Sequence, residues 1–332
     1  MDHVRWGIIG CGDVTEVKSG PGFQKATGSS LTAVMRRDRA KAEDYARRHG
    51  VGRVHATAED LIGDPEVDAV YIATPPATHE PLAVLAAAAG KPCLVEKPMA
   101  RTHAECQRML DAFRVAGVPL WVAYYRRALP RFLKVRDLLS SGAIGRLTSV
   151  HVQVTDKLVT GADAAHWRFD PVQAGAGLFL DLASHCLDLV DFLVAPITAA
   201  RGFALNTGRT YDPEDVTCAA FLCGATVAGT GVWNFHADAK TDVMVFTGSD
   251  GTLTTPVFTD GDVVVSRAGA IDVLTLRNPP HVHQPLIQTI VDELRGQGRC
   301  ASTGESGART ALVMDRCLER YYGRQISTKP QA

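Results

Sequence analysis

The chain has 332 residues, enough for about two domains of ordinary size. Its 35 basic and 36 acidic side chains nearly cancel, and 46% hydrophobic with 21% charged residues is typical of a globular protein, so no nucleic-acid-binding surface is indicated. The longest nearly uniform apolar run, residues 82–89, is far shorter than the ~20 residues that cross a bilayer. We therefore expect no membrane span.

The N-terminus and the cysteines indicate a compartment. Residues 1–6 lead directly into an apolar strand, without the basic and apolar segments of a secretion signal. The eight cysteines form no Cys-x-x-Cys pair and show no zinc-finger spacing, so we expect reduced thiols in or near the core. These features predict a cytoplasmic protein.

The first part of the chain alternates short apolar runs with helical stretches. Strict alternation of this kind predicts a doubly wound parallel sheet, the Rossmann arrangement of an α/β protein, and we assign residues 1–123 to it as a nucleotide-binding domain. The expected strands are residues 4–9, 31–35, 69–73, 93–95 and 120–123, and the expected helices are residues 40–49, 58–62, 80–89 and 104–116.

Beyond about residue 145 the pattern changes to longer β-rich segments. We expect a second α/β domain, residues 124–332, built on a large, open and mostly antiparallel sheet and ending in a helix over residues 307–322. One face of such a sheet can be left for a partner subunit, so a homodimer or homotetramer is expected through it. The β-rich segments are residues 147–154, 198–206, 216–232 and 242–248.

A glycine-rich turn follows the first strand. Gly10 and Gly12 match the first two positions of Gly-x-Gly-x-x-Gly, and Thr15 takes the third. The first glycine permits a tight turn, and the second lets backbone N–H groups of Asp13 and Val14 approach a pyrophosphate. Because this turn opens the first βαβ unit, we predict dinucleotide binding there.

The residues at the end of the second strand distinguish an NADP(H) site from an NAD(H) site. Arg36 and Arg37 stand where NAD-preferring sites carry a carboxylate, and a guanidinium there can bind a 2′-phosphate. We predict NADP(H), with NAD(H) possible. In the alternative, the two arginines are solvated and Asp38 takes the ribose hydroxyl.

The third predicted strand leads into a further loop at the same edge of the sheet. Thr74 and Pro75 follow this strand, and His79 lies just beyond them. Loops at the carboxyl ends of parallel strands meet the bound nucleotide, so we place all three at the cofactor site.

An ordered set of motifs runs through the chain. Gly-x-Gly near the start, Ala-Thr-Pro after a middle strand, Glu96-Lys97-Pro98, and Asp181-x-x-x-His185-x-x-Asp188 follow one another. On a helix, the last three side chains would project from one face. In this order and spacing the motifs resemble the glucose-fructose oxidoreductase / inositol dehydrogenase / rhizopine catabolism family, over almost the whole chain. In that family a Rossmann domain precedes a domain with an open antiparallel sheet.

The resemblance implies roles for individual residues. Carried over by position, Lys97 is the catalytic-site lysine, His185 is the proton donor or acceptor, and Asp181 is its partner at the substrate. Glu96 then belongs with Lys97 at the cofactor. The implied activity is an oxidoreductase that moves a hydride to or from the carbonyl or secondary hydroxyl of a sugar, cyclitol or related polyol. An imidazole with an ordinary pKa of about 6.5 suits the proton transfer, and a lysine suits a developing alkoxide.

Other side chains are placed at the substrate on weaker grounds. Tyr125 and Arg126 follow the last Rossmann strand and could line the pocket, while Trp167 and Arg168 could close over a polyol. The sequence departs from the family pattern at Thr15 and at Ala176, which interrupts a glycine run. Each of these two residues could change the shape of the pocket. Three further histidines are expected on the surface or in loops, namely His166, His281 and His283.

Alternatives remain for the central segment. The i, i+4 spacing of Asp181 and His185 would permit two metal ligands, but no second cluster completes a site, so no metal is expected. The face could also be the polar side of an ordinary amphipathic helix. The chain could bind the nucleotide as a non-catalytic sensor, although a sensor would not need Lys97, Asp181 and His185 together.

Overall fold

The computed structural model describes residues 2–323 and divides them into two compact units. The first unit combines residues 2–129 with residues 278–308, and the second combines residues 130–277 with residues 309–323. The expected division into residues 1–123 and 124–332 therefore misses one feature. A segment from late in the chain completes the first unit, because its apolar side chains belong to that unit's core.

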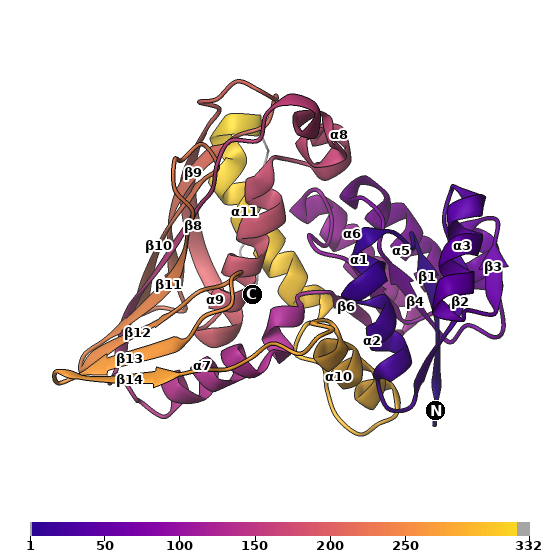
Figure 1. The fold of residues 1–332 in the computed structure, drawn as a ribbon, viewed down its shortest axis with the longest axis horizontal. Coiled ribbons are helices and arrows are strands. Elements are labelled where there is room, and N and C mark those ends of the chain that lie inside the picture. Colours follow the sequence, from indigo (N-terminus) through magenta and orange to yellow (C-terminus); the bar gives the residue numbers. More distant parts are fainter. Residues whose placement is uncertain (1, 324–332) are drawn as a thin grey trace. The chain divides into compact units, whose positions relative to one another are not determined.

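The first unit contains a six-stranded parallel sheet in the order β3-β2-β1-β4-β5-β6 (Figure 1). This order reverses beside β1, which is the Rossmann arrangement predicted from the alternating pattern. Its strands are β1 (Val4–Ile9), β2 (Ser29–Met35), β3 (Arg53–His55), β4 (Ala69–Ile72), β5 (Cys93–Val95) and β6 (Leu120–Val122). The five expected strands are present, and β3 is an additional edge strand.

Helices cover both faces of this sheet because successive residues of a strand point to opposite sides. Trp6 of β1 packs against Phe23 of α2, with ring centroids 4.8 Å apart, while a Cβ on the adjacent Gly7 would lie 2.6 Å from Leu61 of α4. The helices are α1 (Asp13–Val17), α2 (Gly20–Lys25), α3 (Arg39–His49), α4 (Ala58–Gly63), α5 (His79–Ala88), α6 (His103–Ala116) and α10 (Gln284–Leu294).

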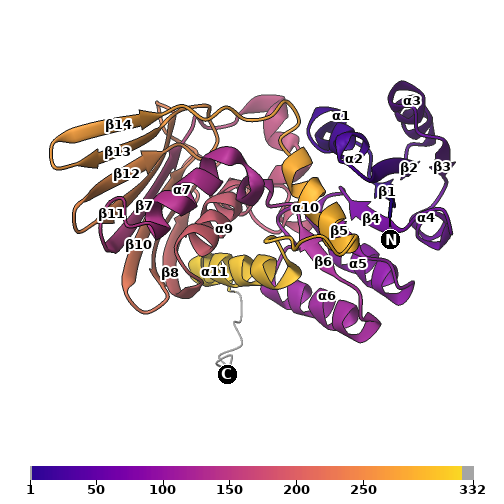
Figure 2. The ribbon, with the colours of Figure 1, turned by 90° about the horizontal axis from the view of Figure 1, so that it is seen from below.

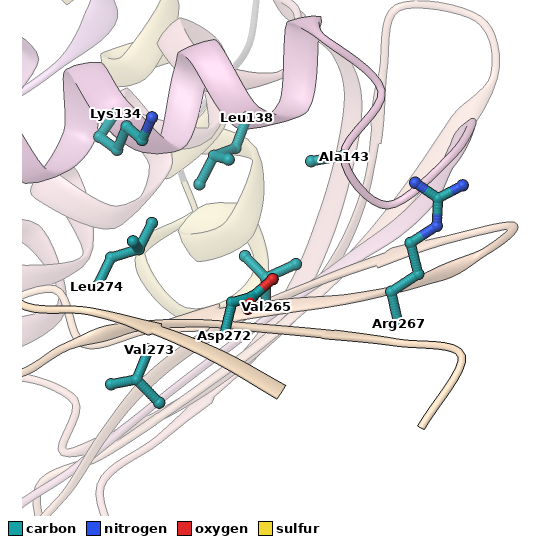
Figure 3. A pocket seen from close by; sticks show the side chains of 8 residues that line it. All are labelled: Lys134, Leu138, Ala143, Val265, Arg267, Asp272, Val273 and Leu274. Atoms are coloured by element: carbon teal, nitrogen blue, oxygen red, sulfur yellow. The ribbon is translucent and has the colours of Figure 1, made fainter. Parts of the chain in front are cut away.

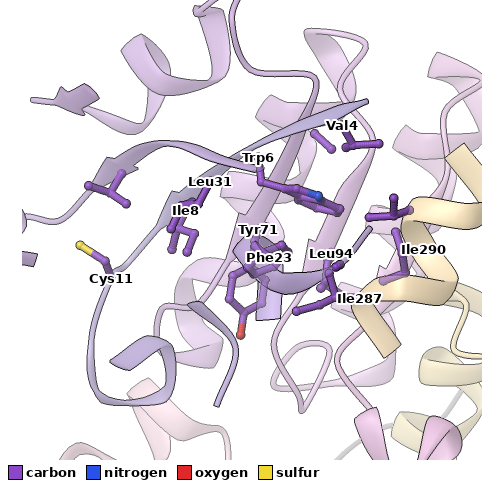
Figure 4. Close-up of a cluster of buried hydrophobic side chains, with 14 of the residues drawn as sticks. Val4, Trp6, Ile8, Cys11, Phe23, Leu31, Tyr71, Leu94, Ile287 and Ile290 are labelled. Carbon is purple, nitrogen blue, oxygen red and sulfur yellow. The ribbon is translucent and has the colours of Figure 1, made fainter. Parts of the chain in front are cut away.

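One buried cluster joins the early and late parts of the first unit (Figure 4). Leu286, Ile287 and Ile290 of α10 pack with Trp6 and Phe23, and all five side chains are at most 1% exposed. Burying a large apolar side chain contributes about 2 kcal/mol. The α10 helix is therefore part of this core and not a surface addition.

The second unit is built on an eight-stranded sheet in the order β14-β13-β12-β11-β7-β10-β9-β8, in which only β7 and β10 run parallel. This confirms the expected open, mostly antiparallel sheet. Its strands are β7 (Leu147–Thr155), β8 (Ile197–Leu205), β9 (Val216–Cys223), β10 (Val227–Asn234), β11 (Thr241–Gly248), β12 (Gly251–Thr255), β13 (Val263–Arg267) and β14 (Ala270–Leu274).

Helices lie against one face of this sheet, as Figures 1 and 2 show from two directions. The inward side chains include Val152, Trp233 and Phe246, all fully buried, and Trp233 meets Phe179 edge to face. Burial alternates along β9 and β10, so the opposite face is open. The helices are α7 (Pro130–Ser140), α8 (Pro171–Ala174), α9 (Ser184–Leu193) and α11 (Gly304–Tyr322), whose first turn belongs to the first unit.

Candidate active site

The turn after β1 requires glycine at its first position. Gly10 has φ +92°, and its N–H donates to Met35 O at 2.8 Å. A Cβ at Gly10 would lie 2.7 Å from Cγ2 of Thr74, so both the backbone conformation and the neighbouring loop exclude a larger residue. The tight turn expected from the motif is therefore present.

Gly12 differs, because nothing within the protein requires a glycine there. Its φ of −125° suits any residue, and the nearest atom to an added Cβ would be Gly10 O at 3.8 Å. The space above Gly12 is open, which fits close approach of a pyrophosphate to the backbone. Thr15, at the third position, is fully buried, and its hydroxyl donates to Gly12 O at 2.7 Å.

The tip of β2 carries Arg36 toward this turn. Its guanidinium donates to Cys11 O at 3.0 Å, whereas Arg37 is exposed. The Asp38 carboxylate instead accepts from the Lys41 N–H at 3.2 Å and caps α3, and this bond lowers the pKa of Asp38. Arg36 is thus the charged side chain that β2 places at the glycine turn.

His79 ties two loops together. Its ring is fully buried, with Nε2 2.7 Å from Thr74 O and Nδ1 3.1 Å from Pro98 O and 3.2 Å from Met99 O. Burial lowers the pKa of this imidazole. Because both ring nitrogens face backbone carbonyls, the direct cofactor contact expected of His79 is replaced by a structural one between the loops after β4 and β5.

Glu96 and Lys97 follow β5 at the same edge of the sheet. The Tyr71 hydroxyl donates to Glu96 Oε1 at 2.5 Å, and the Lys97 N–H donates to Glu96 Oε2 at 3.1 Å. Full burial, reinforced by the Glu96 charge, raises the pKa of Tyr71 well above its usual value. The Glu96 carboxylate is therefore held in place beside the Lys97 backbone.

Tyr125 and Arg126 begin the turn after β6. They lie beside His283, which was expected on the surface or in a loop. His283 is 2% exposed, and its ring stacks on Tyr125 with centroids 4.4 Å apart. The Arg126 guanidinium lies 4.7 Å from the centroid of the same Tyr125 ring, and His283 Nδ1 is 3.8 Å from Glu96 Oε1. Of the expected surface or loop position, only the loop part holds, because His283 is buried in the turn before α10.

The surroundings of His283 are positively charged. Burial, together with the charges of Lys18, Arg126 and Lys97, lowers the pKa of this imidazole to about 3. Lys18 was also not foreseen as a site residue. Neither position carries a local motif, and only the return of the chain before α10 brings His283 to this loop cluster.

In the second unit, Asp181 and His185 lie on successive helical segments of different kinds. Residues Phe179–Ala183 form a π-helical turn, and the α-helix α9 begins at Ser184. The expectation of one regular α-helix is corrected in this respect. A wide turn of this kind is common at functional sites.

The predicted substrate residues of the second unit gather beside Asp181. Arg168 Nε is 3.3 Å from Asp181 Oδ2, and the Arg168 guanidinium lies 4.9 Å from the ring centroid of Trp167. Both ion-pair partners are partly exposed, with side-chain exposures of 46% and 24%. His166, as expected, is exposed, and His281 is partly buried against Val17 O.

His185 is 4% exposed, and its ring meets Phe258 edge to face with centroids 6.0 Å apart. Asp188, one turn further along α9, is 1% exposed. A solvated polar face on an amphipathic helix would leave these side chains in water, so that interpretation of the segment is wrong. The imidazole is instead buried, with Phe258 of the same unit beside it.

Residues 2–323, which the structure describes, offer neither a metal-binding group nor a membrane-spanning helix. No group of three or more His, Cys, Asp or Glu side chains in this range is placed to hold a metal ion, and no helix in it is long and apolar enough to cross a membrane. A pocket in the second unit, between α7 and the β13–β14 hairpin, is lined by Lys134, Leu138, Asp272 and Leu274 among others (Figure 3). It contains none of the candidate site residues.

Comparison with known proteins identifies the family. Residues 4–124 match the oxidoreductase family with an NAD-binding Rossmann fold, and residues 132–254 match the GFO/IDH/MocA C-terminal domain. Oxidoreductase P35 from Formosa agariphila is 35% identical over 316 residues, covering 94% of this chain and 98% of its own. The chain belongs to the Gfo/Idh/MocA oxidoreductase family. It is accordingly an enzyme of the NAD(P)-dependent dehydrogenase and reductase class.

Other relatives extend the comparison. The 1,5-anhydro-D-fructose reductase of Ensifer adhaerens is 28% identical, covering 91% of this chain and 92% of its own. The crystal structure of aldose-aldose oxidoreductase from Caulobacter crescentus, complexed with glycerol, has the same fold, with a TM-score of 0.85 at 22% identity over 97% of this chain and 98% of its own. Levoglucosan dehydrogenase, solved with NADH and levoglucosan, matches with a TM-score of 0.84 over 96% of both chains at 22% identity.

Proposed function

We propose that this Gfo/Idh/MocA protein is an NADP(H)-dependent oxidoreductase that transfers a hydride to or from the carbonyl or secondary hydroxyl of a sugar, cyclitol or related polyol. The observation that carries the proposal is the enclosed imidazole of His185, four residues after the carboxylate of Asp181, in a chain of this family. The relatives named for 1,5-anhydro-D-fructose and levoglucosan support a carbohydrate substrate.

The first unit supplies the groups for cofactor binding. Backbone N–H groups at Gly12, Asp13 and Val14 face the pyrophosphate, and Gly10 permits the tight turn that presents them. The open space at Gly12 supports this placement. Thr74, Pro75, Glu96 and Lys97 contribute from the loops after β4 and β5, which His79 holds together. When bound, the nicotinamide supplies the chemistry of hydride donation or acceptance.

Cofactor preference is assigned to the tip of β2. Arg36, with Arg37 beside it, binds the 2′-phosphate of NADP(H). The use of Asp38 as the cap of α3 supports this choice over NAD(H), because its carboxylate is already engaged by the Lys41 N–H.

His185 and Lys97 have different roles in the reaction. His185 takes the hydroxyl proton during alcohol oxidation and returns it during carbonyl reduction, since a neutral imidazole is a base near neutral pH. Lys97 stabilises negative charge on the substrate oxygen, and Asp181 orients the hydroxyl. Tyr125 and Arg126 in the first unit, and Trp167 and Arg168 in the second, contact the remaining hydroxyl groups.

The open face of the second unit's sheet is assigned to a homodimer or homotetramer. Its outward side chains on β9 and β10 are small and uncharged, including Cys218, Ala220, Ala228 and Thr230, and Leu222 is 46% exposed. A flat, uncharged sheet face of this kind suits contact with a second copy. We place the enzyme in the cytoplasm, in keeping with eight cysteines that form no Cys-x-x-Cys pair.

Two single variants test the mechanism. His185→Ala and Lys97→Ala should each lower kcat by about 10²- to 10⁴-fold while NADPH affinity, followed by tryptophan fluorescence, changes by less than several-fold. Substrates are a panel of keto-sugars and polyols monitored at the nicotinamide absorbance. Lys134→Ala, on α7 and outside the proposed site, is the matched control. NADPH binding without turnover of any substrate by the wild type would instead identify a sensor, and unchanged kcat in both variants would remove the mechanism.

Cofactor preference has its own test. Arg36→Ala should raise the KM for NADPH about 10-fold or more and leave the KM for NADH within about two-fold, because a charge-assisted phosphate contact is lost only for NADPH. Arg39→Ala, an exposed neighbour paired with Glu43, is the control. A wild-type kcat/KM that favours NADH would contradict the assignment.

A further inference from the structure

The loop between β12 and β13 is held far more firmly than an exposed hairpin connection requires. Asp242, on the adjacent strand β11, accepts from the backbone N–H groups of Val257, Phe258 and Thr259 at 2.8, 2.8 and 2.7 Å. The Thr259 hydroxyl donates to the same carboxylate at 2.9 Å. Bonds to an ionised acceptor are the stronger kind, so this carboxylate fixes the backbone on either side of one side chain, Phe258.

A second charged side chain holds the same loop from α7. Arg131 is 2% exposed, and its guanidinium donates to Thr259 O at 2.9 Å and to Gly261 O at 3.1 Å. The loop is also folded closely on itself, since a Cβ on Gly261 would lie 2.8 Å from Pro256 Cγ. Two elements of the second unit therefore contribute ionic side chains to a connection of only a few residues.

The residue fixed by these contacts touches the proposed acid/base group. Phe258 is partly buried, and its ring meets the His185 imidazole edge to face, at 6.0 Å between centroids and 75° between planes. Aromatic pairs in this geometry have a preferred orientation, so a fixed phenyl ring restricts the rotation of its neighbour. Thr259 and Asp260, the next two residues, are exposed.

We propose that Asp242 and Arg131 form a clamp that sets Phe258 as the positioning residue of the His185 imidazole. The inference rests on the proposed role of His185. Phe258 performs no proton transfer itself, and it keeps the imidazole at the angle at which its nitrogen reaches the substrate hydroxyl. An imidazole that is free to turn would spend less time in this geometry, and small misplacements of a reacting group are costly.

The test compares Phe258→Ala and Asp242→Asn with Phe258→Tyr, which keeps the ring, and with Val273→Ala on the exposed strand β14 as the control. We expect kcat to fall about 10-fold in Phe258→Ala and by a smaller factor in Asp242→Asn, with the KM for the nucleotide within about two-fold of wild type. Phe258→Tyr, which keeps the ring, should retain most of the wild-type kcat. A merely structural role would lower the melting temperature without this pattern.

A spectroscopic measurement is independent of turnover. The ring proton signals of His185, assigned by their loss in His185→Ala, should move and broaden in Phe258→Ala and stay near their wild-type positions in Phe258→Tyr. If kcat and these signals are unchanged in both Phe258→Ala and Asp242→Asn while His185→Ala abolishes turnover, the positioning role is overturned and the proposed function stands. Full turnover in His185→Ala would overturn the proposed function and the positioning role with it.

Discussion

The two units bring their candidate site residues together in different ways. In the first unit, Glu96, Lys97 and Tyr125 follow neighbouring parallel strands, so the order of the strands alone places them at one edge. In the second unit, Asp181 and His185 lie on consecutive helical segments, a π-helical turn and α9. A loop from elsewhere is fixed beside His185 by the charged side chains of Asp242 and Arg131. A parallel sheet supplies its site through topology, whereas an antiparallel sheet with covering helices needs dedicated contacts.

The largest effect on stability is expected at Glu214 of the second unit, which is 1% exposed. Its carboxylate accepts from the Gly177 N–H, at 3.0 and 3.1 Å to its two oxygens, and from the hydroxyl of Tyr322 near the end of α11. Glu214→Ala removes the acceptor for the buried Gly177 N–H, just before the π-helical turn, and for the partly buried Tyr322 hydroxyl. We expect a loss of about 3 kcal/mol in the free energy of unfolding and a fall in kcat, measured by urea titration and steady-state kinetics.

The exposed neighbour Asp212 provides the control for that experiment. Asp212→Ala should change the free energy of unfolding by less than about 0.5 kcal/mol. Similar stabilities for the two variants would show that the second unit does not depend on its buried carboxylate, and would remove the contrast between the units.

A smaller effect is expected from the corresponding contact in the first unit. Tyr71→Phe deletes the hydroxyl that donates to Glu96 at 2.5 Å but leaves the Lys97 N–H in place as a donor. We expect about 1.5 kcal/mol of destabilisation, because one buried hydrogen bond to a charged group is lost. Tyr45→Phe, which removes the 3.0 Å hydrogen bond to Thr15 O, should cost about 1 kcal/mol and serves as the comparison. If Tyr71→Phe lowers the free energy of unfolding more than Glu214→Ala does, the expectation that the second unit depends more on its buried carboxylate is contradicted.

The smallest expected effect depends on pH. Glu16 of α1 is bound by both terminal nitrogens of Arg48, at 2.6 and 2.7 Å, and by His49, and the Arg48 hydrogen bonds hold the pKa of Glu16 at about 2, below its ordinary 4.5. A lowered carboxylate pKa stabilises the folded state above pH 4.5, and this contribution is lost as the pH falls from 4.5 toward 2.

Glu16→Gln should therefore cost about 1 kcal/mol at pH 7, a modest amount because both partners are partly exposed. The difference from wild type should shrink steadily as urea titrations are repeated between pH 4.5 and pH 2.5. Glu43→Gln, whose carboxylate pairs with exposed Arg39, should show little effect at any pH. A difference that stays constant with pH would exclude the ionic origin of this contact.

Much of the first unit could be predicted from the sequence. Alternating apolar and helical segments gave five of its six strands to within two residues. Glu96 and Lys97 were singled out through the family resemblance, and the structure places both directly after β5. His283 could not be foreseen, because its burial depends on a segment that returns to this unit from late in the chain. His79 was placed just beyond the loop after β4, where it begins α5, but its three carbonyl contacts follow only from the folded backbone.

The second unit was less predictable in detail. Its open antiparallel sheet and final helix were foreseen, but the π-helical turn at Asp181 was not, since no residue type there distinguishes a π turn from an α turn. Phe258 and Asp242 carry no motif either. Asp242 reaches Phe258 across the β11–β12 hairpin, and Phe258 meets His185 from a segment far along the chain. Local sequence indicates neither contact.

The return of residues 278–308 has a consequence for synthesis on the ribosome. Domains commonly fold as they emerge, beginning with the N-terminal one. Here the N-terminal sheet lacks Leu286, Ile287 and Ile290 from its core until nearly nine-tenths of the chain has been made. The nascent first 129 residues therefore expose an apolar patch over Trp6 and Phe23 while the second unit is still being translated, and the unit that begins first is among the last parts of the protein to be finished.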